Sequence, residues 1–120
     1  MNATRELDQE RYRLHAEVCR VLADPKRLML LDVLREGEHS VGELADRLGC
    51  LLANASQHLT VLRSAGLVGS RRDGNTIYYH LAEPEILGAC DVVHRMVGRR
   101  MGLIREPAAE REPATAVQSR

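Results

Sequence analysis

Hydrophobic and polar positions alternate with a helical period over much of this chain. Glu6–Leu22 spaces its apolar side chains three and four positions apart, and Pro25–Arg35 does so again. Asp24 stands between them, and Asp followed by Pro is typical of a helix start, because Asp accepts unpaired amide hydrogens and Pro suits the first helical position. The pattern predicts two helices. The second is expected to direct these side chains into the core: Leu28, Leu31, Val33 and Leu34.

Two shorter helices are predicted next. Ser40-Val41-Gly42-Glu43 has the sequence of a capping box, in which the serine and glutamate side chains each accept a backbone amide hydrogen. Gly49 is expected to end the helix that the box opens, and His39 to lie in the loop before it. A second amphipathic run, Ala53–Ala65, follows and stops at Gly66. These signals predict two helices joined by a few residues.

A β-hairpin and a last helix complete the pattern. Arg71–Asn75 is typical of a tight turn, and Thr76–Leu81 alternates as a half-buried strand does. Pro84 is predicted to begin the final helix. Two short helices followed by a basic-tipped hairpin make a winged helix-turn-helix, an arrangement that binds duplex DNA. The predicted fold is mainly α with a small β-hairpin.

Length and composition limit the organisation of the protein. A chain of 120 residues suits one compact domain, expected over residues 1–104. The Ala, Pro, Glu and Arg content of residues 105–120 predicts a disordered tail. With 17 basic and 17 acidic residues the net charge is zero, so DNA binding must depend on local positive charge.

The chain contains neither a membrane-spanning run nor the apolar centre of a signal peptide. A cytoplasmic protein with reduced thiols is therefore expected. The first and last predicted helices carry apolar stripes that the small central domain has no room to bury. A homodimer would bury them, and it would suit DNA half-sites about 34–36 Å apart.

Candidate DNA contacts gather on the second short helix and the hairpin. They are Asn54, Ser56, Gln57, His58, Arg63, Arg71 and Arg72. Gln pairs with adenine in the major groove, and Ser binds either phosphate or a base edge. Arginines at a wing enter the minor groove or bind phosphate. The alternative is a solvated polar helix face beside an ordinary charged hairpin.

Two histidine–cysteine pairs have the spacing of metal ligands. His15 and Cys19 are four positions apart in the first predicted helix, and Cys90 and His94 are four apart in the last. If these helices pack together across a dimer, the four side chains suit tetrahedral zinc, another soft metal ion or a metalloid, with Asp91 adjacent. Two alternatives stay open: a disulfide or polysulfide bridge between Cys19 and Cys90, and a purely structural role.

Five strings occur in order along the chain: Leu22–Leu28, Val41–Ala45, Ser56–Leu59, Leu62–Val68 and Arg71–Gly74. Together they resemble the ArsR/SmtB family of dimeric bacterial repressors over about residues 12–97. The resemblance implies a repressor that leaves its operator when a metal ion, a metalloid or a reactive sulfur species or oxidant acts on it.

The chain departs from the family pattern at its recognition helix and its sensor. Leu51-Leu52-Ala53 stands where the family has polar residues, which raises the alternative of a protein-interaction module that no longer binds an operator. The family's Cys-x-Cys arsenic motif is missing, and Met96 stands near an expected zinc-binding histidine. No arrangement typical of a catalytic site is recognisable, so the protein is not predicted to be an enzyme.

Overall fold

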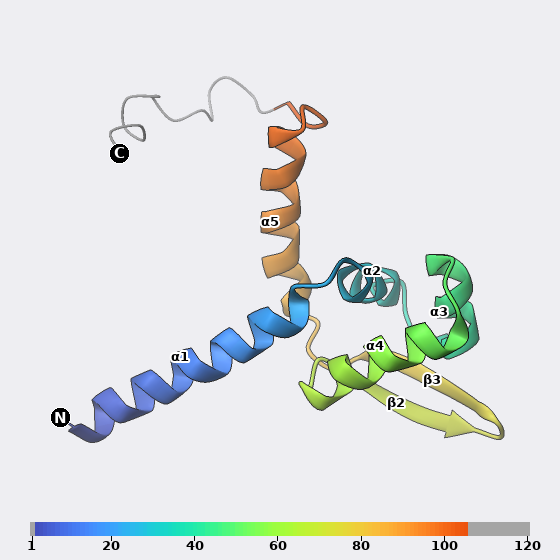
Figure 1. Cartoon of the computed structure of the whole chain (residues 1–120), viewed down its shortest axis with the longest axis horizontal. Helices are drawn as coiled ribbons and strands as arrows, with labels where there is room; N and C mark the ends of the chain where they lie inside the picture. Colours follow the sequence, from blue (N-terminus) through green and yellow to red (C-terminus); the bar gives the residue numbers. More distant parts are fainter. Residues whose placement is uncertain (1, 106–120) are drawn as a thin grey trace. The chain divides into compact units, whose positions relative to one another are not determined.

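The computed structural model describes residues 2–105 (Figure 1). Its elements are α1 (Asn2–Leu22), α2 (Pro25–Leu34), β1 (His39–Ser40), α3 (Val41–Leu48), α4 (Leu52–Ser64), β2 (Val68–Asp73), β3 (Thr76–Leu81) and α5 (Ile86–Arg100). The chain divides into two compact units, Met1–Leu87 and Gly88–Arg120. The predicted disordered tail, residues 105–120, lies outside the described residues from 106 onward.

Side-chain caps begin α2 and α3 where they were predicted. The Asp24 carboxylate accepts hydrogen bonds from two backbone amides of the first turn of α2, at 2.9 and 3.2 Å. Ser40 and Glu43 form the capping box, with distances of 3.1 and 2.8 Å between the paired atoms. Gly49 ends α3 in the left-handed conformation, with a φ of 67°. Because these hydrogen bonds are local, the sequence was enough to predict them.

Two helix starts differ from the prediction by two residues or more. Helix α1 begins at Asn2 rather than Glu6. The apolar spacing did not reveal its first turn, because that turn is polar. Helix α5 begins at Ile86 rather than Pro84. The Ile86 and Leu87 amides donate to the carbonyl oxygens of Glu83 and Pro84, which makes a tight turn ahead of the helix.

The wing is a three-stranded antiparallel sheet with strand order β1-β3-β2. His39 and Ser40 of β1 pair with Tyr79 and Tyr78 of β3. The prediction that His39 lies in a loop is therefore wrong. A two-residue strand has no periodicity of its own, and only its distant partner reveals it.

Strands β2 and β3 pair as far as Asp73 and Thr76, which leaves Gly74 and Asn75 to make the turn. Gly74 has a φ of 65°, a conformation that glycine adopts without steric cost. The two arginines that were predicted to flank the tip lie within β2 itself.

Leucine side chains make most of the core of the first unit. The buried cluster is Leu30, Leu31, Leu34, Leu44, Leu59, Leu62, Leu67, Val68 and Tyr79. Tyr79 shares one face of β3 with Ile77 and Leu81, which also pack against the cluster, so the strand is half-buried as its alternation predicted. Leu28 is 41% exposed, so the prediction that it belongs to the core is wrong, and Leu30 is buried instead.

In the second unit, α5 ends in a reversal that depends on glycine. The Leu103 amide donates to the Gly98 carbonyl oxygen at 2.9 Å, and Gly102 has a φ of 75°. A Cβ at Gly98 would lie 2.7 Å from Cδ1 of Ile104, which packs there. The glycines thus terminate the helix and let the chain fold back on it. Among the described residues, no helix is both long and apolar enough to cross a bilayer.

Candidate nucleic-acid interface

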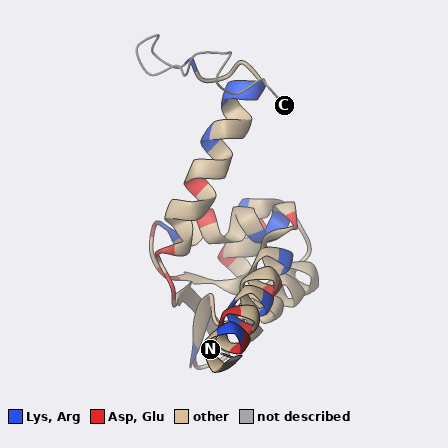
Figure 2. Ribbon diagram, turned by 90° about the vertical axis from the view of Figure 1, so that its left-hand side faces the viewer, with Lys and Arg blue, Asp and Glu red and all other residues tan. Residues whose placement is uncertain are grey.

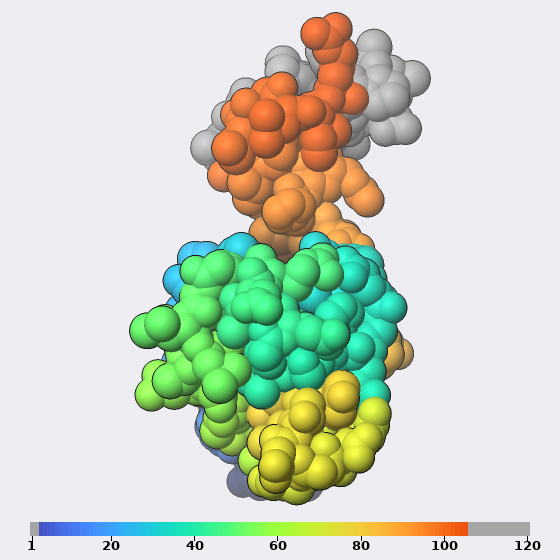
Figure 3. Space-filling model, turned by 90° about the vertical axis from the view of Figure 1, so that its right-hand side faces the viewer, coloured from blue at the N-terminus to red at the C-terminus, as the bar shows by residue number. Residues whose placement is uncertain are grey.

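Helix α4 presents a polar face because its apolar face is buried. Ala55, Leu59 and Leu62 are each 0% exposed and hold the helix against the core. Asn54 and Gln57 therefore project into solvent. The helix contains no acidic residue and is followed directly by the hairpin, which lies on the same side of the molecule in Figure 3. An exposed polar helix free of negative charge suits a nucleic acid.

His58 does not share this exposed face. Its Nδ1 atom lies 3.2 Å from Nη1 of Arg27 and 3.9 Å from Oδ1 of Asp24, and its side chain is 17% exposed. Arg27 also donates from Nε to the carbonyl oxygen of Val21. These contacts connect the end of α1, the start of α2 and the middle of α4. The geometry gives His58 a role in orienting α4, and its contact with DNA stays a prediction.

Asp24 remains ionised at this junction. Partial burial acts to raise its pKa, but hydrogen bonds from the Arg27 and Lys26 amides, together with the nearby His58 ring and Arg27 charge, hold the pKa below its ordinary value. The carboxylate therefore caps α2 at neutral pH.

The two adjacent arginines of the wing have different surroundings. Arg71 donates from Nε and Nη2 to the Glu38 carboxylate, both at 2.8 Å, and its guanidinium carbon lies 4.5 Å from the centroid of the Tyr78 ring. The hydrogen bond from Arg71 lowers the pKa of Glu38. Arg72 is exposed, and within residues 2–105 its side chain makes no hydrogen bond or ion pair. Arg72 is thus ready to bind a phosphate, whereas Arg71 must first leave Glu38.

Arg63 and Ser56 occupy intermediate positions. Nη1 of Arg63 donates to Oγ of Ser70 at 3.0 Å, which joins the last turn of α4 to β2. The rest of the exposed guanidinium remains accessible beside the wing. Ser56 is half-buried, and its carbonyl oxygen accepts a hydrogen bond from Oγ1 of Thr60 at 2.9 Å.

The start of α4 is apolar and carries no side-chain cap. Leu51 occupies the N-cap position, where it offers no hydrogen bond to the first turn. Leu51 is 78% exposed and Leu52 is 55% exposed. These leucines are part of the departure from the family pattern, and both side chains extend into solvent.

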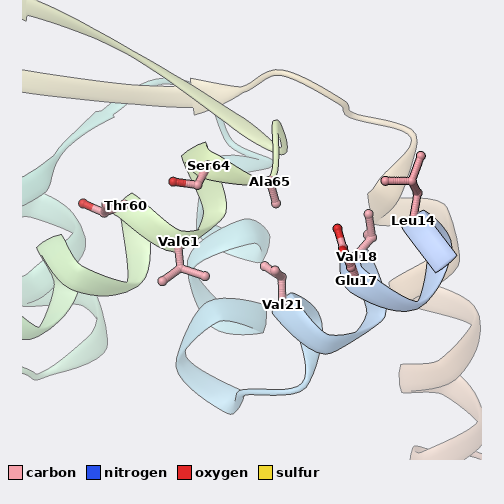
Figure 4. Close-up of a pocket in the computed structure, with 8 residues that line it drawn as sticks. All are labelled: Leu14, Glu17, Val18, Val21, Thr60, Val61, Ser64 and Ala65. Carbon is pink, nitrogen blue, oxygen red and sulfur yellow. The ribbon is translucent and has the colours of Figure 1, made fainter.

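A groove of about 510 Å³ separates α1 from the later part of α4 (Figure 4). Its lining is mostly apolar and consists of Leu14, Glu17, Val18, Val21, Thr60, Val61, Ser64 and Ala65. The α4 residues of this lining begin at Thr60. The earlier half of the helix, with Asn54 and Gln57, is outside the groove.

The predicted metal ligands lie on two helices that belong to different units. His15 and Cys19 are exposed on α1, whereas Cys90 is half-buried and His94 exposed on α5. Across residues 2–105 of the single chain, no three His, Cys, Asp or Glu side chains gather closely enough to hold a metal ion. Each pair alone supplies at most two ligands, fewer than the four of a structural zinc site.

Known proteins are similar to this chain in both sequence and fold. Residues 22–71 match a family model described as a helix-turn-helix domain. Rv0081 of Mycobacterium tuberculosis, an uncharacterised HTH-type transcriptional regulator, is 43% identical over 89 residues, which span 73% of this chain and 78% of the relative. Its crystal structure superposes with a TM-score of 0.66 at 41% identity, covering 76% of this chain and 92% of that one.

Two further solved structures extend the comparison. The homodimeric winged helix-turn-helix DNA-binding domain Mb0332 from Mycobacterium bovis, a possible ArsR-family regulator, has a TM-score of 0.71 at 30% identity, with 83% of this chain and 93% of that chain covered. The transcriptional repressor BigR from Xylella fastidiosa has a TM-score of 0.67 at 37% identity, with coverages of 77% and 94%.

Proposed function

The chain belongs to the winged helix-turn-helix transcriptional regulators of the ArsR type, and from that premise we propose that it is a repressor that binds a duplex operator as a homodimer. The exposed polar face of α4 carries the proposal: burial of Ala55, Leu59 and Leu62 directs Asn54 and Gln57 outward. The protein-interaction alternative is less well supported, because this face continues into a basic wing.

The proposed contacts divide into base recognition and backbone positioning. Gln57 pairs with the edge of an adenine, and Asn54 reaches a base edge or phosphate near it. Arg63 and Arg72 bind phosphates, which set the register of the helix without reading sequence. Arg71 contributes only after it exchanges Glu38 for a phosphate. Ser56, next to Gln57 in sequence, is half-buried and makes a weaker contact with the DNA.

Exposed apolar side chains on α1 and α5 support the homodimer. Leu7 and Leu14 of α1 are 71% and 47% exposed, and Val93 and Val97 of α5 are 56% and 41% exposed. Burying such stripes against a second copy stabilises both copies. Basic and acidic residues are interspersed along α1, as Figure 2 shows, so the apolar stripe rather than net charge drives this association.

The test is selection of binding sequences from random duplex DNA, followed by mobility shift on the selected site. We expect a two-fold symmetric sequence. Gln57→Ala should weaken specific binding about 5- to 150-fold for each half-site, because an amide–adenine pair contributes about 1–3 kcal/mol and a dimer loses one pair at each half-site. Gln9→Ala, the same change on the exposed surface of α1, is the matched control and should bind normally.

The wing is tested by the salt dependence of binding. Arg72→Gln should make the slope of log K against log salt shallower by about two, one phosphate for each protomer of a dimer. Arg5→Gln, on the side of α1 opposite Leu7 and Leu14, makes the same change in net charge and should leave the slope unchanged. If no sequence is enriched, or if Gln57→Ala and Arg72→Gln both bind as the wild type does, the proposal is wrong.

We further propose that an effector acting at the histidine–cysteine pairs releases the operator. The exposure of His15, Cys19 and His94 supports access by a soft metal ion, a metalloid, or a reactive sulfur species or oxidant. Operator release by zinc, cadmium, arsenite, persulfide and peroxide should be compared in wild type, Cys19→Ser and Cys90→Ser. If neither substitution changes any response, the cysteines are not the sensor.

A further inference from the structure

An apolar patch lies on the surface of the first unit, at the start of α4. It consists of Leu51, Leu52 and Ala53, all exposed, and we call it the α4 patch. Leu51 and Leu52 keep 78% and 55% of their surface in water, although burial of a leucine side chain is favourable. A partner that covers these side chains would recover that free energy.

The α4 patch is continuous with the proposed recognition surface. Residues four positions apart on a helix are neighbours, so Leu52 lies beside Ser56 and Ala53 beside Gln57. In helix-turn-helix proteins the first residues of the recognition helix contact base edges. The charge of the helix agrees with this position, because no acidic side chain in α4 would repel phosphates.

The major groove offers one apolar group on its base edges, the C5 methyl group of thymine. We propose that the α4 patch recognises thymine methyl groups next to the base pair contacted by Gln57, which makes it a determinant of operator sequence. This inference rests on the proposed DNA-binding function. Polar side chains at these positions would form hydrogen bonds with the donors and acceptors on the base edges. Leucine and alanine instead distinguish thymine from cytosine and from uracil through the methyl group alone.

The experiment removes that methyl group from the DNA. Thymines in the selected operator are replaced with deoxyuridine, first one at a time and then symmetrically in both half-sites. Loss of one buried methyl group should weaken binding about fourfold, and loss of the symmetric pair about fifteenfold. Deoxyuridine placed in the flanking DNA, outside the half-sites, is the control and should have no effect.

The double variant Leu51→Ser, Leu52→Ser assigns the effect to the protein. Because both side chains are exposed, the variant should fold, which its thermal unfolding checks. It should lose most of the wild-type preference for thymine over deoxyuridine, whatever its absolute affinity, because only Ala53 of the α4 patch is left unchanged. Leu103→Ser, at a leucine 72% exposed in the second unit, is the matched control and should keep the wild-type preference for thymine.

The outcomes separate this inference from the function on which it rests. If the wild type binds its selected operator specifically but tolerates deoxyuridine at every position, the methyl proposal is wrong and the regulator function stands. The same holds if the double variant keeps the thymine preference. If selection enriches no sequence, both proposals fail, and the α4 patch then belongs to a protein interface.

Discussion

The two helices of the helix-turn-helix are held in place by different means. Helix α3 is fixed at its beginning by the Ser40–Glu43 capping box, by the pairing of β1 with β3 and by the Glu38–Arg71 ion pair just before it. Helix α4 has no side-chain cap and begins with two exposed leucines.

What holds α4 is burial along its length. Its inner face contributes Ala55, Leu59 and Leu62 to the core, and His58 connects it to Arg27 and Asp24. The contrast shows how a recognition helix can be firmly oriented while its first turn stays open to DNA. The start of α3 is thus secured by hydrogen bonds, some local and some long-range, whereas α4 depends on packing along its length.

The largest effect should come from removing that packing. Leu59→Ala should lower the free energy of unfolding by about 2–5 kcal/mol, since it deletes a fully buried side chain and leaves a cavity. Urea unfolding at fixed protein concentration measures the change. Val61→Ala on the same helix, where the side chain is 38% exposed, should cost much less. Equal losses in the two variants would mean that burial does not hold α4.

Removing the side-chain cap of α3 is expected to lower the free energy of unfolding by a smaller amount. Ser40→Ala removes the side chain that accepts the Glu43 amide hydrogen, and it should cost about 1 kcal/mol in the same measurement. Ser64→Ala, at the exposed end of α4, is the control. If Ser40→Ala is neutral, the cap does not stabilise α3 and the contrast between the two helices is weaker than the geometry indicates.

At the start of α4, a substitution is expected to raise the free energy of unfolding rather than lower it. Leu51→Ser supplies the missing N-cap and should raise the free energy of unfolding by about 0.5–1 kcal/mol. The same chemical group thus stabilises one helix when added and destabilises the other when removed. A loss of stability in Leu51→Ser would show that the leucine packs against the protein rather than projecting from it.

The smallest effect concerns the Glu38–Arg71 pair in front of α3. The hydrogen bond from Arg71 lowers the pKa of Glu38, so the pair stabilises the fold above the ordinary glutamate pKa and stops doing so as pH falls through the lowered value. Glu38→Gln should be slightly less stable than wild type at about pH 7, and the difference should shrink as the pH falls below the ordinary pKa of glutamate. A difference that persists in acid would have another cause than this ion pair.

Glu38→Gln also tests the wing. Freed from the carboxylate, Arg71 should bind phosphate more readily, so the variant's affinity for non-specific DNA should rise and its salt dependence should steepen. Glu36→Gln, which releases Arg47 in the same way, is the matched control away from the wing.

The amino-acid sequence by itself determined the order of the elements and the caps between them. Asp24, Ser40, Glu43 and Gly49 form hydrogen bonds or turns with residues only a few positions away, so their roles follow from local chemistry. The alternation of β3 likewise predicted a half-buried strand, and the structure buries its Tyr79 side chain.

Only the tertiary structure decided features whose partners are distant in sequence. Arg27 and His58 are 31 positions apart, and Glu38 and Arg71 are 33 apart. The pairing of β1 with β3 is equally non-local, and so is the choice of Leu30 over Leu28 for the core. No local pattern encodes such contacts, because they form only when packing brings separate elements together. For that reason the sequence alone made His58 and Gln57 look alike, and the fold distinguished the inward residue from the outward one.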